Sequence, residues 1–221
     1  MTVHQITRFG LVNAYLVEED DGLTLIDTTV RGGQKAILAA AKALGQPIVR
    51  IVLTHAHIDH TGALDAVVAA VPDAEVSISA RDARLLAGDM SLDADEPQGK
   101  VKGGFSKLTT TPARTFVAGE RLGSLEVVAA PGHTPGHVAL LDTRDRTLYC
   151  GDAFATVGRV ATSAKSAKRF PLPGVATWDR ATALASARAL RALDPTRLAP
   201  GHGKVVEQPG AAMDAAIAKG A

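Results

Sequence analysis

The sequence predicts an α/β fold in which apolar strands alternate with helices in both halves of the chain. In the first half, Leu11–Val17 and Leu23–Ile26 flank an acidic turn. In the second half, Val138–Leu141 and Thr147–Cys150 flank the turn Asp142-Thr143-Arg144-Asp145, and an aspartate follows each pair. Residues 48–54 (IVRIVLT) are almost wholly apolar and β-branched, as in a strand covered on both faces. The repetition indicates a duplicated strand and helix arrangement; the alternative is two unrelated hairpins that look alike.

The other elements of the first half follow from spacing and from Gly and Pro breaks. Gly32–Leu44 has apolar residues at helical spacing and is followed by a glycine, which predicts a helix. Leu64–Val71 predicts a second helix, which a proline ends. Val76–Ser79 predicts a short strand and Ala80–Ala87 a short helix.

Two long stretches, Gly88–Pro112 and Phe154–Thr177, are rich in Gly, Pro and polar residues and show no clear period. Loops of this length inside a compact domain are often functional, so these stretches could cover a site. The remaining elements are strands at Leu125–Ala129 and Arg197–Ala199 and helices at Trp178–Leu193 and Ala211–Ala218. The length of 221 residues favours a single domain over residues 1–221.

Composition excludes several classes of protein. Hydrophobic residues make up 46% of the chain, which argues against disorder, and no apolar run is long enough to span a membrane. The net charge of +1 and the 4% aromatic content argue against a nucleic-acid partner. The start of the chain lacks the pattern of a signal peptide, and Cys150 is the only cysteine. We therefore expect a cytoplasmic protein.

The segment His55-Ala56-His57-Ile58-Asp59-His60 concentrates metal-binding side chains directly after a strand. Side chains two residues apart in extended chain point the same way. His55, His57 and Asp59 would therefore converge, and the turn into the next helix would bring His60 to them. Imidazoles and carboxylates are good ligands for zinc. The alternative, a polar helix cap with surface histidines, does not account for such a concentration.

Three more candidate ligands, His133, Asp152 and His202, each follow an apolar strand on a turn that contains glycine. If these strand ends lie at one edge, seven ligand groups meet there, which is enough for two metal ions. The seven are His55, His57, Asp59, His60, His133, Asp152 and His202.

This set of motifs resembles that of the metallo-β-lactamase-fold hydrolase superfamily, with a glyoxalase-type or lactonase-like metal site. The matching residues are His-x-His-x-Asp-His at 55–60, Pro-Gly-His-Thr-Pro-Gly-His at 131–137, Gly-Asp at 151–152 and Pro-Gly-His-Gly at 200–203. The resemblance extends over nearly the whole chain and implies a four-layer αββα sandwich with the metal ions at one edge. It says much less about the substrate, because one fold supports many hydrolyses.

The family pattern also implies a division of the ligands. His55, His57 and His133 would hold one metal, Asp59, His60 and His202 the other, and Asp152 would bridge them. We expect two Zn²⁺ per chain, with iron or manganese as alternatives. The ions would lower the pKa of a water so that metal-bound hydroxide attacks the substrate. Asp59 would be the catalytic residue that positions this nucleophile and passes its proton to the leaving group.

Some nearby residues have weaker assignments. Asp27 is expected to orient the 55–60 segment, although a turn cap is the alternative. His137 is expected to be structural, and Cys150 to be a buried, inert thiol rather than a ligand. Tyr15 would either donate to substrate or pack, and Trp178 would anchor its helix.

Six cationic residues lie in the two irregular stretches: Lys100, Lys102, Lys107, Lys165, Lys168 and Arg169. If they line the site, they favour an anionic substrate. The alternative is ordinary solvated charge on loops.

Departures from subfamily patterns narrow the function. A bridging aspartate favours thioesterases and lactonases over β-lactamases. The short segment after His202 argues against a glyoxalase that binds glutathione, and the absence of tyrosine from residues 153–221 argues against an acyl-homoserine lactonase. We expect a metal-dependent hydrolase of a small ester, lactone or thioester. The alternatives are a mononuclear-iron enzyme similar to sulfur dioxygenases, a β-lactamase or phosphodiesterase of this fold, and a non-catalytic metal-binding module. The expected partner is a small molecule; the oligomeric state stays open.

Overall fold

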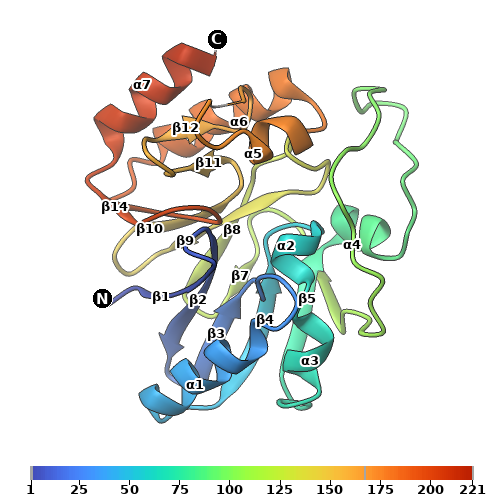
Figure 1. Ribbon diagram of the computed structural model, residues 1–221, viewed down its shortest axis with the longest axis vertical. Helices are drawn as coiled ribbons and strands as arrows, with labels where there is room; N and C mark the ends of the chain where they lie inside the picture. The colour runs from blue at the N-terminus through green and yellow to red at the C-terminus, as the bar shows by residue number, and fades with distance from the viewer. Residues whose placement is uncertain (1, 167, 221) are drawn as a thin grey trace.

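Two six-stranded sheets lie face to face in the computed structural model, which describes residues 2–166 and 168–220 (Figure 1). The first sheet has its strands in chain order: β1 (His4–Arg8), β2 (Val12–Glu19), β3 (Gly22–Ile26), β4 (Ile48–Leu53), β5 (Glu75–Ser79) and β6 (Arg114–Phe116). From β3 onward its neighbours are parallel, whereas the β1–β2 and β2–β3 pairs are antiparallel.

The second sheet belongs to the later part of the chain. Its spatial order is β14 (Val206–Glu207), β13 (Arg197–Pro200), β10 (Thr147–Gly151), β9 (Val138–Asp142), β8 (Leu125–Ala129) and β7 (Arg121–Leu122). A separate pair is formed by β11 (Phe154–Ala155) and β12 (Ala161–Thr162). The pairing in β8-β9-β10-β13 is the same as in β1-β2-β3-β4: two antiparallel contacts, then a parallel one.

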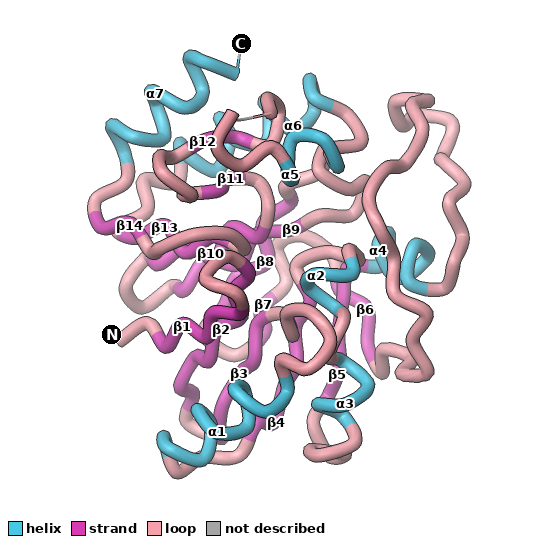
Figure 2. The backbone as a smooth tube through the Cα atoms, in the orientation of Figure 1, coloured by secondary structure: helices cyan, strands magenta, loops and turns pink. Residues whose placement is uncertain are grey.

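Helices form the outer layers (Figure 2). Those of the first half are α1 (Gln34–Leu44), α2 (Ile58–Thr61), α3 (Leu64–Val68) and α4 (Ala80–Leu86). Those of the second half are α5 (Leu172–Ala176), α6 (Arg180–Ala192) and α7 (Gly210–Gly220). Among the described helices, none has the length and apolar character needed to cross a membrane.

Three apolar clusters fill the spaces between the layers. Ile51 of β4 packs with residues of α1 and α3, whereas its neighbour Val52 points the other way and packs with Leu140 of the second sheet. On the far side, Leu148 of β10 packs with Leu190 of α6. The central strands are buried on both faces, which explains their nearly continuous apolar sequence. The four-layer αββα sandwich is confirmed.

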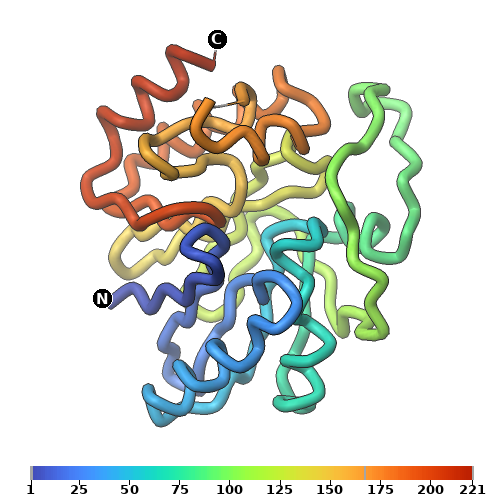
Figure 3. Tube along the Cα trace, viewed as in Figure 1, coloured from blue at the N-terminus to red at the C-terminus, as the bar shows by residue number. Residues whose placement is uncertain are grey.

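The two irregular stretches differ from each other. Residues 88–112 contain no helix or strand, as predicted, and run along one side of the molecule (Figure 3). The prediction for Phe154–Thr177 was wrong in part, because this stretch contains β11, β12 and α5; residue 167 lies outside the described residues. Such two-residue strands have no detectable alternation, and the Pro and Gly of α5 are ordinary helix breakers.

Candidate metal centre

The segment 55–60 spans the loop after β4 and the first turn of α2. His55 and His57 lie in the loop, and Asp59 and His60 lie in the helix. All three histidines are buried, whereas the side chain of Asp59 is 32% exposed. The turn into the helix therefore brings His60 back to the loop histidines, as the sequence predicted, and leaves Asp59 at the surface of the site.

The structure brings all seven candidate ligands together. Three sets of side-chain atoms lie within 4.8 Å of one another: His55 with His57 and His133; His55 with His60 and Asp152; and Asp59 with His60 and His202. The first and third sets are the two ligand sets expected from the sequence, and the second connects them.

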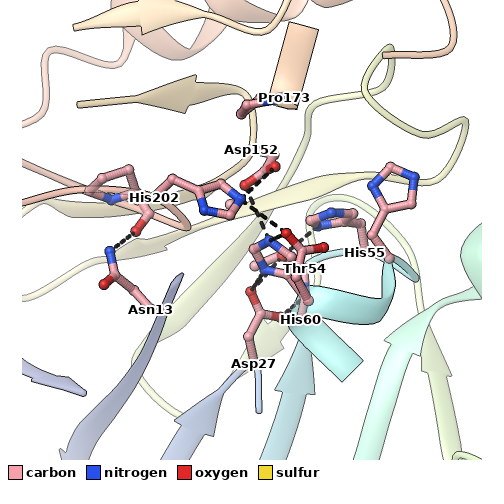
Figure 4. Close-up of polar contacts among 12 residues, drawn as sticks. Asn13, Asp27, Thr54, His55, His60, Asp152, Pro173 and His202 are labelled. Atoms are coloured by element: carbon pink, nitrogen blue, oxygen red, sulfur yellow. Dashed lines mark hydrogen bonds and ion pairs between the residues drawn. The ribbon is translucent and has the colours of Figure 1, made fainter. Parts of the chain in front are cut away.

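Asp152 occupies the middle of this cluster (Figure 4). Its Oδ2 atom lies 3.3 Å from His133 Nε2 and 3.2 Å from His202 Nε2, and its Oδ1 atom lies 3.2 Å from His60 Nε2. One carboxylate thus contacts histidines of both sets. This is the position that a bridging ligand needs.

Each of the five histidines is held so that only one ring nitrogen faces the cluster. The other nitrogen contacts Thr54 Oγ1 in His55, the Lys102 carbonyl in His57, Asp27 Oδ2 in His60, Thr177 Oγ1 in His133 and the Leu11 carbonyl in His202. Since each partner accepts the N–H, the nitrogen that faces the cluster carries a lone pair when the ring is neutral. This arrangement fixes tautomers that suit metal binding. Burial alone would lower the pKa of His60 and His202, but Asp152 outweighs it and raises both pKa values, that of His202 to about 9, so a metal ion would displace a proton from these two rings.

Unpartnered buried atoms give an independent test of whether the cluster fits metal ions. His55 Nε2 is buried and has no hydrogen-bond or ion-pair partner among the described residues, and His60 Nε2 and Asp152 Oδ1 form no hydrogen bond there although they lie 3.2 Å apart as an ion pair. Leaving a buried polar atom unpaired costs about 1–3 kcal/mol, and such atoms are rare in folded proteins. Cations at these positions would remove that cost. The residues therefore fit a borderline divalent metal such as zinc or iron.

Burial and charge set the protonation of the cluster. Burial lowers the pKa of His55 and His133, which favours the neutral imidazole that a ligand must be. Burial alone would raise the pKa of Asp59, but His60 and His202 outweigh it and lower that pKa to about 2. Asp59 is therefore ionised at neutral pH.

Asp27 contacts the segment from below, in the orienting position that the sequence suggested. Its carboxylate accepts hydrogen bonds from the backbone N–H and the hydroxyl of Thr54, both at 2.8 Å, and lies 2.7 Å from His60 Nδ1 (Figure 4). These contacts fix both the end of β4 and the ring of His60.

Asp82 is a functional residue that sequence reasoning missed. It is fully buried in the first turn of α4, and its carboxylate accepts from Ala56 N at 2.9 Å, Thr134 Oγ1 at 2.7 Å and Gly136 N at 2.7 Å. It therefore joins the loop of His55 and His57 to the loop of His133. No local signal marks it, because an acidic residue three positions after a capping serine, here Ser79, is common at any helix start.

His137 and Cys150 lie beside the cluster but belong to none of the three ligand sets. His137 Nε2 accepts from Asp152 N at 3.0 Å while its Nδ1 contacts the Ala130 carbonyl at 3.1 Å, so it positions the backbone of Asp152. Cys150 is fully buried in the apolar core between the second sheet and its helices, and burial raises the pKa of its thiol.

Tyr15 packs rather than facing substrate. Its hydroxyl is buried and donates to the Pro200 carbonyl at 2.7 Å. Asn13 Nδ2 donates to the same carbonyl at 2.9 Å and to that of Gly203 at 2.7 Å. The N-terminal hairpin therefore holds the turn that carries His202.

The two irregular stretches meet at the ligands. Lys102 contacts His57 through its carbonyl at 2.9 Å, and its Nζ donates to the Thr177 carbonyl at 3.0 Å. Trp178 Nε1 donates to the Gly99 carbonyl at 2.9 Å. Trp178 thus anchors residues 88–112, and it lies between α5 and α6 rather than in the helix predicted to begin there.

The comparisons with known proteins agree with this geometry. A family model described as the metallo-beta-lactamase superfamily matches residues 7–202. The chain belongs to this superfamily. A crystal structure of the protein TTHA1623 in a di-iron-bound form superposes with a TM-score of 0.68 and 32% identity, and covers 95% of this chain and 96% of that one. A metallo-beta-lactamase from Pontibacter korlensis superposes with a TM-score of 0.70 at 21% identity, over 98% of this chain and 91% of that one, which shows the shared fold.

The names of similar proteins indicate a class of reaction but no substrate for this chain. The uncharacterized protein YobT of Bacillus subtilis is 46% identical over 99% of this chain and 95% of its own length. A hydroxyacylglutathione hydrolase of Rhodospirillum rubrum is 32% identical over 72% of this chain, but the match covers only 54% of that protein. The superfamily and the name of this hydrolase indicate a metal-dependent hydrolase.

Proposed function

We propose that the protein is a dinuclear metallohydrolase that cleaves a small ester, lactone or thioester. The position of Asp152 supports this most directly, because one carboxylate within 3.3 Å of histidines from both ligand sets suits a pair of ions and not one. When bound, two ions supply Lewis acidity and lower the pKa of a water molecule. Hydrolysis of a carbonyl substrate requires both effects. The donor set fits Zn²⁺, and the di-iron form of a similar protein keeps iron as the alternative.

Within this proposal the chain positions the ions and moves one proton. His55, His57 and His133 would hold one ion, Asp59, His60 and His202 the other, with Asp152 between them. Asp59 is ionised and partly exposed at the cleft, and its Oδ2 lies 3.3 Å from His202 Nε2. Its other oxygen is then available to accept a proton from the nucleophile and to deliver it to the leaving alkoxide or thiolate.

The test is a substrate panel on one preparation of known metal content. Protein loaded with zinc, or with iron, should bind two ions per chain and hydrolyse activated esters, lactones or thioesters, with much weaker turnover of β-lactams. A β-lactam preferred about tenfold in kcat/KM over every other substrate, equal to about 1.4 kcal/mol of transition-state stabilisation, would contradict the proposal. So would one ion per chain after metal addition, or oxygen uptake in place of hydrolysis.

A further inference from the structure

A cleft of about 380 Å³ lies over the metal cluster, between α2 and α5. Ile58 and the backbone at Gly103 line one side, and α5 lines the other with Leu172, Pro173 and Val175. Figure 4 shows Pro173 next to Asp152. A molecule that reaches the metal cluster from this cleft therefore touches α2 and α5.

The side chains of these walls are apolar and unusually exposed. Ile58 is 49% exposed, and Leu172 and Val175 are each 59% exposed. They are three of the seven large hydrophobic residues that the described chain exposes. Isolated exposed apolar residues are normal, but a group around a concave site marks a surface that a ligand covers.

The packing of α5 forces two of these residues outward. Pro173 and Gly174 form its buried side, and a Cβ on Gly174 would lie only 2.5 Å from Ser166 N. Leu172 and Val175 are three residues apart and share the opposite, exposed face. The sequence thus keeps two branched apolar side chains at the cleft, where solvent contact is unfavourable without a ligand.

The cleft offers no cationic partner for an anionic substrate. Among the described residues that line it, none is a lysine or arginine, and the polar ones are candidate metal ligands. Lys102 Nζ instead donates to the Thr177 carbonyl, and Lys165 Nζ to the Lys219 carbonyl. The six cations of the two irregular stretches therefore do not supply recognition of charge at this site.

We propose that Ile58, Leu172 and Val175 form a binding site for an uncharged aliphatic acyl group. The inference rests on the proposed hydrolase function, since it places the acyl carbon at the metal cluster and the hydrocarbon tail between α2 and α5. Short-chain acyl esters, lactones and thioesters are the substrate class. Acyl groups that carry a second charge are excluded, because the apolar walls would desolvate that charge without a partner.

Binding of the acid products tests this directly. Calorimetry on zinc-loaded protein would compare acetate, butyrate and hexanoate, and hexanoate with the dicarboxylate adipate. Affinity should rise about two- to fourfold per methylene, and adipate should bind more weakly than hexanoate. Val175→Thr, which keeps the shape but replaces a methyl group with a hydroxyl, should reduce the gain per methylene. Val117→Thr is the matched control, because Val117 is also 59% exposed but does not line the cleft.

Each outcome has a distinct meaning. Equal affinity for the three acids, or no binding, would overturn the acyl site, as would equal effects of Val175→Thr and Val117→Thr. The matching acetyl, butyryl and hexanoyl esters are assayed in parallel. If affinity depends on chain length but no ester is cleaved, the acyl site stands and the proposed reaction is wrong.

Discussion

The two halves of the molecule share a strand pairing but present their candidate ligands in different ways. The first half places four on one segment, residues 55–60, at the end of β4 and the start of α2. The second half places one on each of three separate turns, which follow β8, β10 and β13. A short segment moves as a unit, whereas residues on three turns keep their distances only if the second sheet and its loops are intact.

The support of the two halves differs accordingly. In the first half, side-chain carboxylates accept from the backbone N–H of Thr54, just before the segment, in the case of Asp27, and of Ala56, within it, in the case of Asp82. In the second half, His137 and the carbonyls of the N-terminal hairpin region hold the turns of Asp152 and His202. A few buried groups thus fix the positions of four candidate ligands in the first half. In the second half, the positions of the candidate ligands depend on contacts with residues spread along the chain.

Metal removal should have the largest effect, because ions bound at the candidate ligands would be the shared partner of both halves. Chelation should abolish hydrolysis and lower Tm by about 5–10 °C, as expected for loss of about 2.7 kcal/mol of stabilisation from a ligand at about 100 times its Kd. Differential scanning calorimetry with and without chelator measures this. Return of activity and Tm on adding zinc is the control; an unchanged Tm would mean that metal does not connect the halves.

Asp152→Ala should reduce kcat/KM by about a thousandfold or more, because it removes the carboxylate that contacts both ligand sets. Metal content should fall from two towards one or none. Cys150→Ser is the neighbouring control, with little expected change in metal content because Cys150 is in no ligand set. Loss of metal from Cys150→Ser but not from Asp152→Ala would show that the ligand assignment is wrong.

Asp82→Asn should lower metal affinity or kcat/KM by about 10–100-fold, the usual range for residues that orient ligands. The amide would turn an N–H toward one of three donors that Asp82 now accepts from. Stability should fall by about 1–3 kcal/mol. Asp73→Asn, at an exposed position, is the control. If both variants behave alike in metal titration and chemical denaturation, Asp82 does not join the two loops.

Gly103→Ala should have a smaller effect on activity, about tenfold in kcat/KM. Gly103 has φ +94° and its added methyl would overlap the ring of His57. Gly88→Ala is the control for backbone strain, because Gly88 has φ +88° but no atom lies within 4 Å of an added methyl. It therefore introduces the strain without the overlap with a neighbouring side chain. Both variants should lose about 1 kcal/mol of stability, but only Gly103→Ala should weaken metal binding. Equal metal affinities would mean that residues 88–112 do not control His57.

The sequence was most informative about candidate ligands whose positions follow from short, local sequence patterns. Histidines and aspartates just past apolar strands identified all seven residues of the cluster, because strand alternation and Gly-containing turns are local properties. Strands buried on both faces were predictable for the same reason. Asp82 and Thr177 were not, since their role depends on loops that are distant in sequence. Helix α5 was missed because the packing that stabilises it around Gly174 is tertiary.

The contact between Asn13 and the last ligand turn has a consequence for the order of folding. Asn13 N donates to the Gly201 carbonyl at 2.8 Å, and its side chain reaches Pro200, 187 residues away in sequence. Contacts of such long range form late, because closing a long chain segment is entropically unfavourable. During synthesis, the segment 55–60 leaves the ribosome well before His202 exists. The ligand set that includes His133 can therefore be complete while the chain is still growing, whereas the set that includes His202 is complete only after the final strands of the second sheet have docked on the N-terminal hairpin.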